Sequence, residues 1–302
     1  MKIKNILEKK RTLSFEIFPP KKDSANIESI YKTIDELSEL NPDFISVTYG
    51  AMGSTTKRTL EIAKYIKNVK HVEALAHLTG INTPHDDVLK MCNEFKMENI
   101  ENIMSLRGDY PVGFNGTPIF KYASELNEFI QKYYNDDFCL GGGCYPEAHL
   151  ECENLFDDLK NLKKKQDSGA SFFITQVFFD NNYFYRFVRE ARNIGITVPI
   201  LAGIMPITSV KQIRKMSTMC GANVPVSLIS MLEKYRDDEK AMREIGIAYA
   251  TNQIIDLLAN DVDGIHIYTM NKPENAKQIV DAIKNVLKDS TNERWNLKIS
   301  RL

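Results

Sequence analysis

The feature that most constrains the fold of this chain is an alternation of short apolar runs and longer amphipathic stretches, which continues from end to end. Several of the short runs are hydrophobic almost without interruption, as parallel strands that are covered on both faces usually are. The eight runs span residues 13–18, 43–48, 72–78, 102–106, 138–142, 171–178, 199–204 and 264–268. The pattern predicts an α/β protein built on a parallel sheet.

Helical patterns fill the segments between these runs. In the first of them, residues 26–40, apolar side chains recur at spacings of three and four and form one stripe. The others span residues 54–68, 84–95, 123–134, 154–168, 183–193, 210–219 and 273–287. An alternation repeated about eight times favours a closed (β/α)8 TIM barrel, with an open doubly wound sheet as the alternative. An extra helical region, residues 226–258, precedes the last strand and could lie over one rim of the barrel.

The whole chain, residues 1–302, is expected to form a single domain, because no linker, repeat or low-complexity segment divides it. The tail, residues 289–302, is polar apart from Trp295, and we expect it to fray. A hydrophobic content of 43% and a charged content of 26% are ordinary for a globular protein.

Composition also excludes several classes of function. The net charge of −1 gives no electrostatic reason to expect nucleic acid or an anionic membrane as a partner. No apolar run approaches the ~20 residues of a membrane span, and the N-terminus lacks the apolar core of a signal peptide. The cysteines, an odd number without CxxC spacing, indicate reduced thiols in a cytoplasmic protein and no metal site. They are Cys92, Cys139, Cys144, Cys152 and Cys220.

In a TIM barrel the active site lies at the carboxyl ends of the strands, so polar residues there are the candidates. Glu16 is flanked by Phe15 and Ile17 in the first run, which Pro19 follows directly. A carboxylate among apolar side chains is costly to bury unpaired, and such surroundings disfavour its charged form. Glu16 is therefore a candidate general acid, although a structural ion pair inside the barrel would explain it equally well.

Two further strand ends carry candidate ligand-binding groups. After the fourth run, Arg107 could bind a phosphate, Gly108 allows close approach of a ligand, and Asp109 can accept hydrogen bonds. A turn with a solvated Arg–Asp pair is the alternative. Gln176, in the sixth run, can donate and accept as recognition of a heterocycle requires, unless it is a satisfied core amide.

The fifth run leads into three glycines, residues 141–143, that form neither GxGxxG nor a GxxxxGK[ST] phosphate loop. His149 and His77 could face a ligand or be structural. The polar helical stretch that contains residues 158–161 and 163–165 would ordinarily be a solvated face. No nucleophile–base pair or metal cluster is evident, so the residues alone indicate a barrel enzyme that handles a polar heterocyclic ligand or cofactor.

Together these segments resemble the methylenetetrahydrofolate reductases. The matching stretches are SFEIFPP (14–20), ISVTYGA (45–51), HLT (77–79), LRGD (106–109), YAS (122–124), YPEAH (145–149), GA (169–170), TQVFFD (175–180), GIMP (203–206) and HIYTMN (266–271). They occur in order through nearly the whole chain. The resemblance implies a bacterial-type member that consists of the catalytic domain only, a FAD-binding (β/α)8 barrel without a C-terminal regulatory domain.

The resemblance also implies an activity. The chain would reduce 5,10-methylenetetrahydrofolate to 5-methyltetrahydrofolate with NAD(P)H, by ping-pong hydride transfer through FAD, in one-carbon metabolism and methionine synthesis. Glu16 would be the acid that opens the imidazolidine ring of the substrate. Asp109 would lie between pterin and flavin, and Gln176 would contact folate and nicotinamide. NADH is the preferred donor because short bacterial relatives usually use it, and we expect a homo-oligomer.

Further site residues follow from the same resemblance. FAD would be lined by Thr48, Tyr49, Ala51, His77, Arg107, Gly108, Asp109, Tyr122, Ala123, Tyr145, His149, Asp158, Asn161 and Lys165. Lys165 would neutralise the pyrophosphate. For this residue, the resemblance therefore replaces the interpretation of the helix as a solvated face. Gln212, Tyr268 and Lys272 would lie near the folate. Two positions depart from the pattern of well-studied bacterial members: Met216 replaces a phenylalanine, and Lys272 replaces an arginine. The lysine keeps the positive charge but lacks the planar group with which an arginine makes two parallel hydrogen bonds.

Other functions remain open at this point. A non-catalytic barrel could keep the ligand site, and a related flavin barrel could take electrons from an iron–sulfur partner protein. A proline-dehydrogenase-like flavin barrel shares the architecture, but it would not need the strand motif around Glu16.

Overall fold

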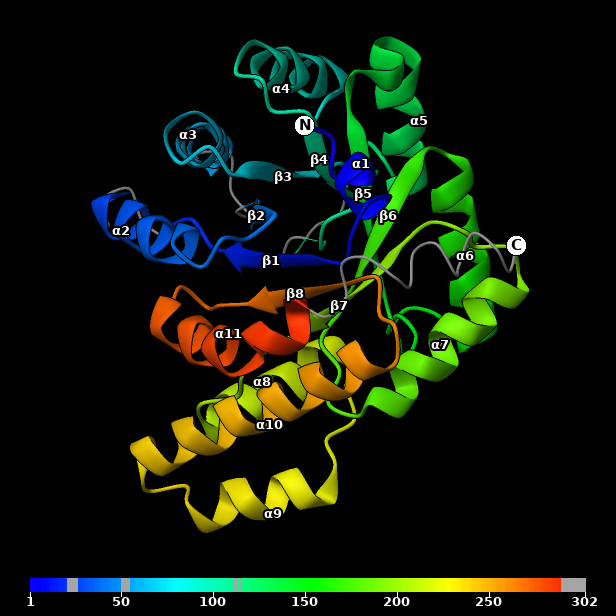
Figure 1. Cartoon of the computed structure of the whole chain (residues 1–302). Helices are drawn as coiled ribbons and strands as arrows, with labels where there is room; N and C mark the ends of the chain where they lie inside the picture. The colour runs from blue at the N-terminus through cyan, green and yellow to red at the C-terminus, as the bar shows by residue number, and fades with distance from the viewer. Residues whose placement is uncertain (21–26, 50–54, 111–112, 114–115, 289–302) are drawn as a thin grey trace.

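Eight parallel strands pair in chain order, and the first also pairs with the last, which closes the sheet into a barrel (Figure 1). The computed structural model describes residues 1–20, 27–49, 55–110, 113 and 116–288. The strands are β1 Thr12–Ile17, β2 Phe44–Val47, β3 Glu73–Thr79, β4 Asn102–Leu106, β5 Cys139–Cys144, β6 Ala170–Thr175, β7 Ile200–Ile204 and β8 Gly264–Tyr268. The structure thus confirms the TIM barrel and excludes the open sheet.

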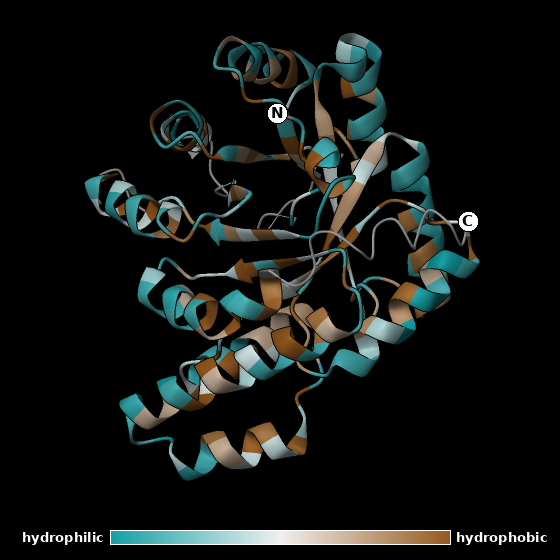
Figure 2. Cartoon of the chain, viewed as in Figure 1, coloured by the Kyte–Doolittle hydropathy of each residue, from teal (hydrophilic) through white to brown (hydrophobic). Residues whose placement is uncertain are grey.

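Helices surround the barrel and turn their apolar faces toward it (Figure 2). They are α1 Ile3–Leu7, α2 Ile27–Ser38, α3 Thr55–Lys64, α4 His85–Met97, α5 Ala123–Tyr134, α6 Leu155–Asp167, α7 Asn181–Asn193, α8 Val210–Cys220, α9 Val226–Lys234, α10 Glu239–Ala259 and α11 Pro273–Lys288. A π-helical turn, Tyr65–Val69, continues α3, and a 3-10 turn, Asn135–Asp137, follows α5. The predicted bounds of β4, β8 and α5 are confirmed, and most others differ by one or two residues.

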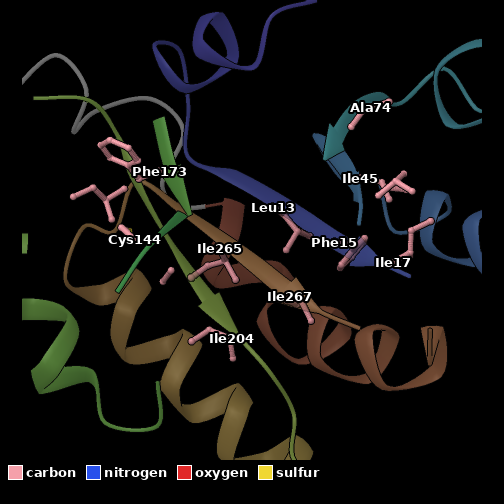
Figure 3. Close-up of a cluster of buried hydrophobic side chains, with 14 of the residues drawn as sticks. Leu13, Phe15, Ile17, Ile45, Ala74, Cys144, Phe173, Ile204, Ile265 and Ile267 are labelled. Atoms are coloured by element: carbon pink, nitrogen blue, oxygen red, sulfur yellow. The ribbon is translucent and has the colours of Figure 1, made fainter. Parts of the chain in front are cut away.

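Each strand separates two environments because successive side chains point to opposite faces. In β1, Leu13, Phe15 and Ile17 are buried in the apolar cluster between the strands and the helices (Figure 3). Ser14 and Glu16 alternate with them and therefore point into the barrel. The same alternation in the other strands gives an apolar outer face and a more varied interior.

The helix α1 closes the barrel at the amino ends of the strands. Ile3 and Leu7 pack with inward-facing strand residues such as Phe44 and Leu75. The side-chain oxygen of Asn102, the first residue of β4, accepts the Ile3 N–H at 2.8 Å. The sequence pattern did not predict α1, because five residues are too few to show helical periodicity. Apolar groups thus fill this end of the barrel, and the polar interior side chains lie toward the other.

The prediction that the sixth strand extends to residue 178 is wrong, because β6 ends at Thr175. Val177 and Phe179, which follow it, are buried in a separate apolar cluster with residues of α8, α9 and α10, including Ile213 and Leu228. The apolar run continues beyond the strand because helices cover it, and this burial produces the same sequence signal as strand pairing.

The extra helical region also differs from the prediction. Residues 226–258 form two helices, because the Asp238 side chain accepts the N–H groups of Lys240 and Ala241 and starts α10 there. The helix α10 contacts β7, α7 and α11 and so belongs to the outer layer of the barrel (Figure 1). The additional helices are therefore α8 and α9, and α8 packs over the segments that follow β6 and β7 through Ile213 and Met216.

Gly246 allows α10 to approach the segment between β7 and α8. A Cβ at this position would lie 1.6 Å from the backbone oxygen of Ile207. In an unobstructed helix, alanine is more favourable than glycine by up to ~1 kcal/mol. Here the clash is with backbone, so we expect Gly246→Ala to lower the free energy of unfolding, by roughly 2 kcal/mol. Urea denaturation followed by circular dichroism measures this, and an unchanged or higher midpoint would contradict the close packing.

Candidate functional site

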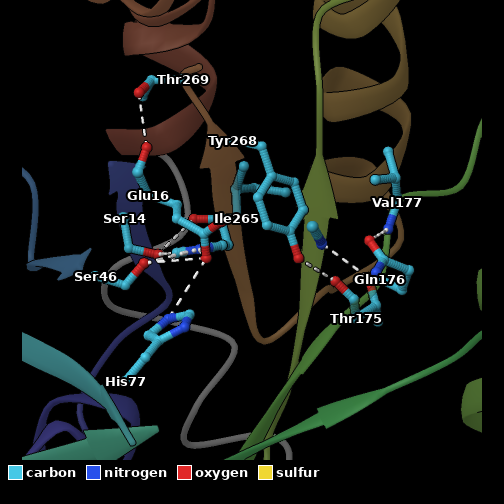
Figure 4. Close-up of polar contacts among 12 residues, drawn as sticks. Ser14, Glu16, Ser46, His77, Thr175, Gln176, Val177, Ile265, Tyr268 and Thr269 are labelled. Atoms are coloured by element: carbon cyan, nitrogen blue, oxygen red, sulfur yellow. Dashed lines mark hydrogen bonds and ion pairs between the residues drawn. The ribbon is translucent and has the colours of Figure 1, made fainter. Parts of the chain in front are cut away.

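Polar side chains from four neighbouring strands meet inside the barrel near its carboxyl end. Glu16 is the penultimate residue of β1 and is only 8% exposed. In the strand register, Glu16 pairs with Ser46 of β2, and Ser14 pairs with His266 of β8. His77 of β3 completes the group, which we call the Glu16 cluster (Figure 4).

Three groups surround one carboxyl oxygen of Glu16. The Ser46 hydroxyl donates to Oε2 at 3.4 Å, and the Nε2 atoms of His77 and His266 lie 3.5 and 3.7 Å from it. On its other side, His266 Nδ1 lies 2.7 Å from the hydroxyl oxygen of Ser14. No lysine or arginine side chain contacts Glu16 within the described ranges, so a carboxylate here would have no strong counter-ion.

Both ring nitrogens of His266 have a hydroxyl partner. The Ser14 hydroxyl oxygen lies 2.7 Å from Nδ1, and the Ser46 hydroxyl oxygen lies 3.4 Å from Nε2. The Ser14 hydroxyl also lies 3.3 Å from the Ile265 carbonyl, and it has only one proton to give, so the tautomer of His266 sets the direction of these bonds.

His77 is a neutral group in the wall of the same site. Burial lowers the pKa of His77 to about 4, against the opposing effect of the Glu16 charge. Although its Nε2 lies 3.5 Å from Glu16 Oε2, this nitrogen has no hydrogen-bond partner in the described part of the chain. A buried polar atom of this kind, directed into the site, is typical of a group that contacts a ligand.

A second group of candidates follows β4. Arg107 forms a bidentate ion pair with Glu151, with Nη–Oε distances of 2.5 and 2.6 Å, and its Nε donates to the Gly108 carbonyl at 3.0 Å. Gly108 has φ +87°, and a Cβ there would meet Thr79 at 3.0 Å, so the position requires glycine. Asp109, the next residue, is exposed.

The third group joins the loop after β5 to one face of α6. Lys165 donates to the Gly143 carbonyl at 2.8 Å and lies over the ring of Tyr145 at 5.7 Å. Asp158 is buried and accepts the backbone N–H of His149 at 3.1 Å. Burial lowers the pKa of Lys165 and raises the pKa of Asp158, and each charge opposes the shift of the other.

The helix α6 thus has two different polar faces. Lys160 and Lys163 pair with the surface carboxylates Asp157 and Asp167. The interpretation of the helix as a solvated face is right for these lysines and wrong for Lys165, whose side chain turns toward β5.

Of the residues expected near the folate, Tyr268 packs edge-on against His266 of the Glu16 cluster, with ring centroids 5.2 Å apart. The Tyr268 hydroxyl donates to the Thr175 carbonyl at 2.6 Å, and burial raises its pKa. Gln176 accepts the N–H of the next residue at 2.8 Å, and Gln212 accepts the N–H of Thr208 at 2.9 Å. Lys272 is exposed beyond the end of β8.

The other expected cofactor residues lie at separate places on the same rim. Thr48 and Tyr49 follow β2 and are half-buried. Tyr122 precedes α5 and is exposed, whereas Ala123 is buried. Asn161 donates from its amide to the sulfur of Cys152 at 3.7 Å. Ala51 lies outside the described residues.

Sequence reasoning missed several members of these groups. Ser14, Ser46 and His266 were not singled out, although Ser14 lies two positions from Glu16 and His266 two positions from Tyr268. That spacing places each pair on one face of a strand and could have identified them. Glu151, the partner of Arg107, had no comparable signal because it lies in a loop.

Two classes of site do not occur in the described residues. There, no three His, Cys, Asp or Glu side chains converge as a metal ion would require. The described helices also include none that is long and apolar enough to span a membrane. All five cysteines are unpaired.

Comparison with known proteins identifies close relatives. The family model for methylenetetrahydrofolate reductase matches residues 2–284. The chain is 37% identical over 289 residues to methylenetetrahydrofolate reductase (NADH) 1 of Arabidopsis thaliana, which covers 91% of this chain and 49% of that one. It is 36% identical over 262 residues to 5,10-methylenetetrahydrofolate reductase of Escherichia coli K12, which covers 87% of each. The chain spans about half the length of the plant relatives.

A solved structure supports the fold. An uncharacterized protein from Clostridium thermocellum, which binds two copies of 5-methyl-5,6,7,8-tetrahydrofolic acid, aligns with a TM-score of 0.65 at 17% identity. The alignment covers 95% of this chain and 98% of the other.

The low pKa of His77 predicts a pH dependence of stability. Because the folded state holds the pKa near 4 and the unfolded chain has the ordinary value near 6.5, the unfolded state binds more protons below pH 6.5. Stability is therefore lost as the pH falls from about 6.5 toward 4, by at most about 3 kcal/mol from this residue. We expect His77→Gln to flatten this slope in urea titrations at successive pH values.

A matched control for this titration is His71→Asn. His71 is exposed and has φ +56°, a conformation that asparagine tolerates. This variant should keep the slope of the parent protein. Equal slopes for all three proteins would show that His77 titrates normally.

Proposed function

Because the chain belongs to the methylenetetrahydrofolate reductase family, we propose that it uses NAD(P)H as electron donor and bound FAD as hydride carrier to reduce 5,10-methylenetetrahydrofolate to 5-methyltetrahydrofolate. The observation that carries the proposal is the buried Glu16 at the carboxyl end of the barrel, where its carboxyl lies beside Ser46, His77 and His266. Its surroundings suit a proton donor, which opening of the imidazolidine ring requires.

Glu16 would protonate the nitrogen that leaves when the ring opens. General acid assistance of this kind is typically worth ~10²–10⁴-fold in rate. Ser46 would orient the carboxyl through its hydrogen bond to Oε2, and Ser14 would hold the imidazole of His266 in place. Tyr268 would stay protonated, because burial raises its pKa.

The residues around the barrel mouth fit a flavin dinucleotide. The unpartnered His77 Nε2 and the glycine required at position 108 both favour close approach of a ligand. Lys165 and Arg107 are cations suited to a pyrophosphate. When bound, FAD would supply the hydride transfer. The residues that would hold it are Thr48, Tyr49, Ala51, His77, Arg107, Gly108, Asp109, Tyr122, Ala123, Tyr145, His149, Asp158, Asn161 and Lys165.

The folate would lie next to the flavin, with Asp109 between them. Glu16, Asp109, Gln176, Gln212, Tyr268 and Lys272 are its proposed contacts. Lys272 would attract the anionic tail of the substrate as a point charge, since an ammonium lacks the planar fork of an arginine. Met216, which is half-buried in the apolar cluster beneath α8, would offer an adaptable apolar surface.

The visible absorbance spectrum of the purified protein tests the proposal. We expect flavin bands that bleach with anaerobic NADH and return on addition of methylenetetrahydrofolate. Bands that resist NADH but bleach with a chemical reductant and return with the folate would favour an iron–sulfur partner as the donor. If reconstitution with FAD yields no flavin spectrum, a non-catalytic ligand-binding barrel is the better account.

The variant Glu16→Gln separates the two half-reactions. The amide cannot donate an acidic proton, so folate reduction should fall by ~10²–10⁴-fold while NADH still bleaches the flavin. Stopped-flow absorbance at the flavin band measures both steps. Glu8→Gln, an exposed position in the turn after α1, is the control and should retain both rates. Normal folate reduction by Glu16→Gln would refute the role of the acid.

A further inference from the structure

The loop between β5 and α6 contains a carboxylate that the proposed cofactor and substrate contacts do not use. Glu147 is half-buried, and its two oxygens accept the backbone N–H of Asn223 at 3.2 and 3.1 Å. The side-chain amide of Asn223 also donates to Glu147 Oε2. Asn223 lies in the turn between α8 and α9, so this contact joins two segments that are 76 residues apart.

A second contact joins the same two segments. Gly221 ends α8 with φ +68°, and Leu150 packs against it so closely that a Cβ at position 221 would lie 2.7 Å from Leu150 Cδ2. Glu147 and Leu150 therefore hold the carboxyl end of α8 from one side.

The loop is fixed at its other side by the cofactor cluster. Ala148 has φ +71°, which is uncommon for a residue other than glycine and persists only when surrounding contacts hold it. Its N–H donates to the Tyr145 carbonyl at 3.1 Å, and the N–H of His149 donates to Asp158 at 3.1 Å. The reversal at Ala148 thus places Glu147 against the α8–α9 turn and His149 against α6.

We propose that Glu147 is a positioning residue that fixes α8 relative to the cofactor-binding loop. The helix α8 contains Gln212 and Met216, so its placement sets the distance between the folate contacts and the flavin contacts. This inference rests on the proposed function. Because a binding element that must be ordered on binding costs affinity, a loosened α8 should weaken folate binding while Glu16 and the cofactor contacts remain intact.

The test compares Glu147→Ala and Glu147→Gln with a matched control. Glu153→Gln changes an exposed carboxylate of the same loop that makes no hydrogen bond or ion pair within the described part of the chain. Loss of a charge-assisted hydrogen bond typically changes an equilibrium about tenfold or somewhat more. We expect Glu147→Ala to raise the KM for methylenetetrahydrofolate about tenfold and to leave kcat within about twofold. Glu147→Gln, which keeps one acceptor oxygen, should have an intermediate KM.

Two measurements that need no turnover complete the test. The dissociation constant of FAD, followed by flavin fluorescence, should be unchanged in all three variants. Amide hydrogen exchange in residues 217–225 should be about tenfold faster in Glu147→Ala, both with and without FAD, and unchanged in Glu153→Gln. Asn223→Ala removes only the side-chain donor, and combined with Glu147→Ala it should add little to the effect of that variant.

Particular outcomes would overturn the inference. An unchanged KM with unchanged exchange would mean that Glu147 does not hold the turn. An FAD dissociation constant that rises as much as the KM would mean that the whole loop has collapsed. If the parent protein binds no flavin, the proposed function fails instead, and the exchange experiment still decides whether Glu147 fixes α8.

Discussion

The pairing of β1 with β8 is the interaction on which the site depends. Without it, β1 would be an edge strand, and Glu16 would have polar neighbours on one side only. With it, Glu16 lies between Ser46 and His266, and Ser14 reaches the far nitrogen of the same imidazole. Barrel closure also removes water from these groups. Hydrogen bonds inside the barrel are therefore electrostatically stronger than they would be at an open surface.

Burial is the main electrostatic effect at this end of the barrel. It keeps His77 neutral, raises the pKa of Asp158 and lowers the pKa of Lys165. A buried cation and a buried carboxylate close together partly compensate each other, and their separation would be costly. A buried ammonium group is also stabilised by any further anion beside it. An anion near Lys165 would therefore be favourable, which is consistent with the binding of a negatively charged cofactor.

The barrel and its loops contribute differently. The strands position Glu16, His77 and His266 rigidly, whereas the proposed folate contacts Gln176 and Gln212 lie after β6 and after β7, in longer connections that need their own support. The helix α10 supports one connection through Gly246, and the loop after β5 supports another through Glu147. Apolar packing and a few hydrogen bonds between loops thus hold the additional helices in place, as sheet pairing holds the strands.

The sequence by itself determined the fold class, because strand and helix periodicities are local, and its motifs indicated the family and most candidate residues. Local pattern could not separate β6 from Val177 and Phe179, since burial under a helix and burial in a sheet select the same side chains. It also could not show that Lys165 faces inward while Lys163 faces water. Only the tertiary structure brought His266 to Glu16 and Asn223 to Glu147, because contacts between residues far apart in the chain depend on barrel closure and on helix packing.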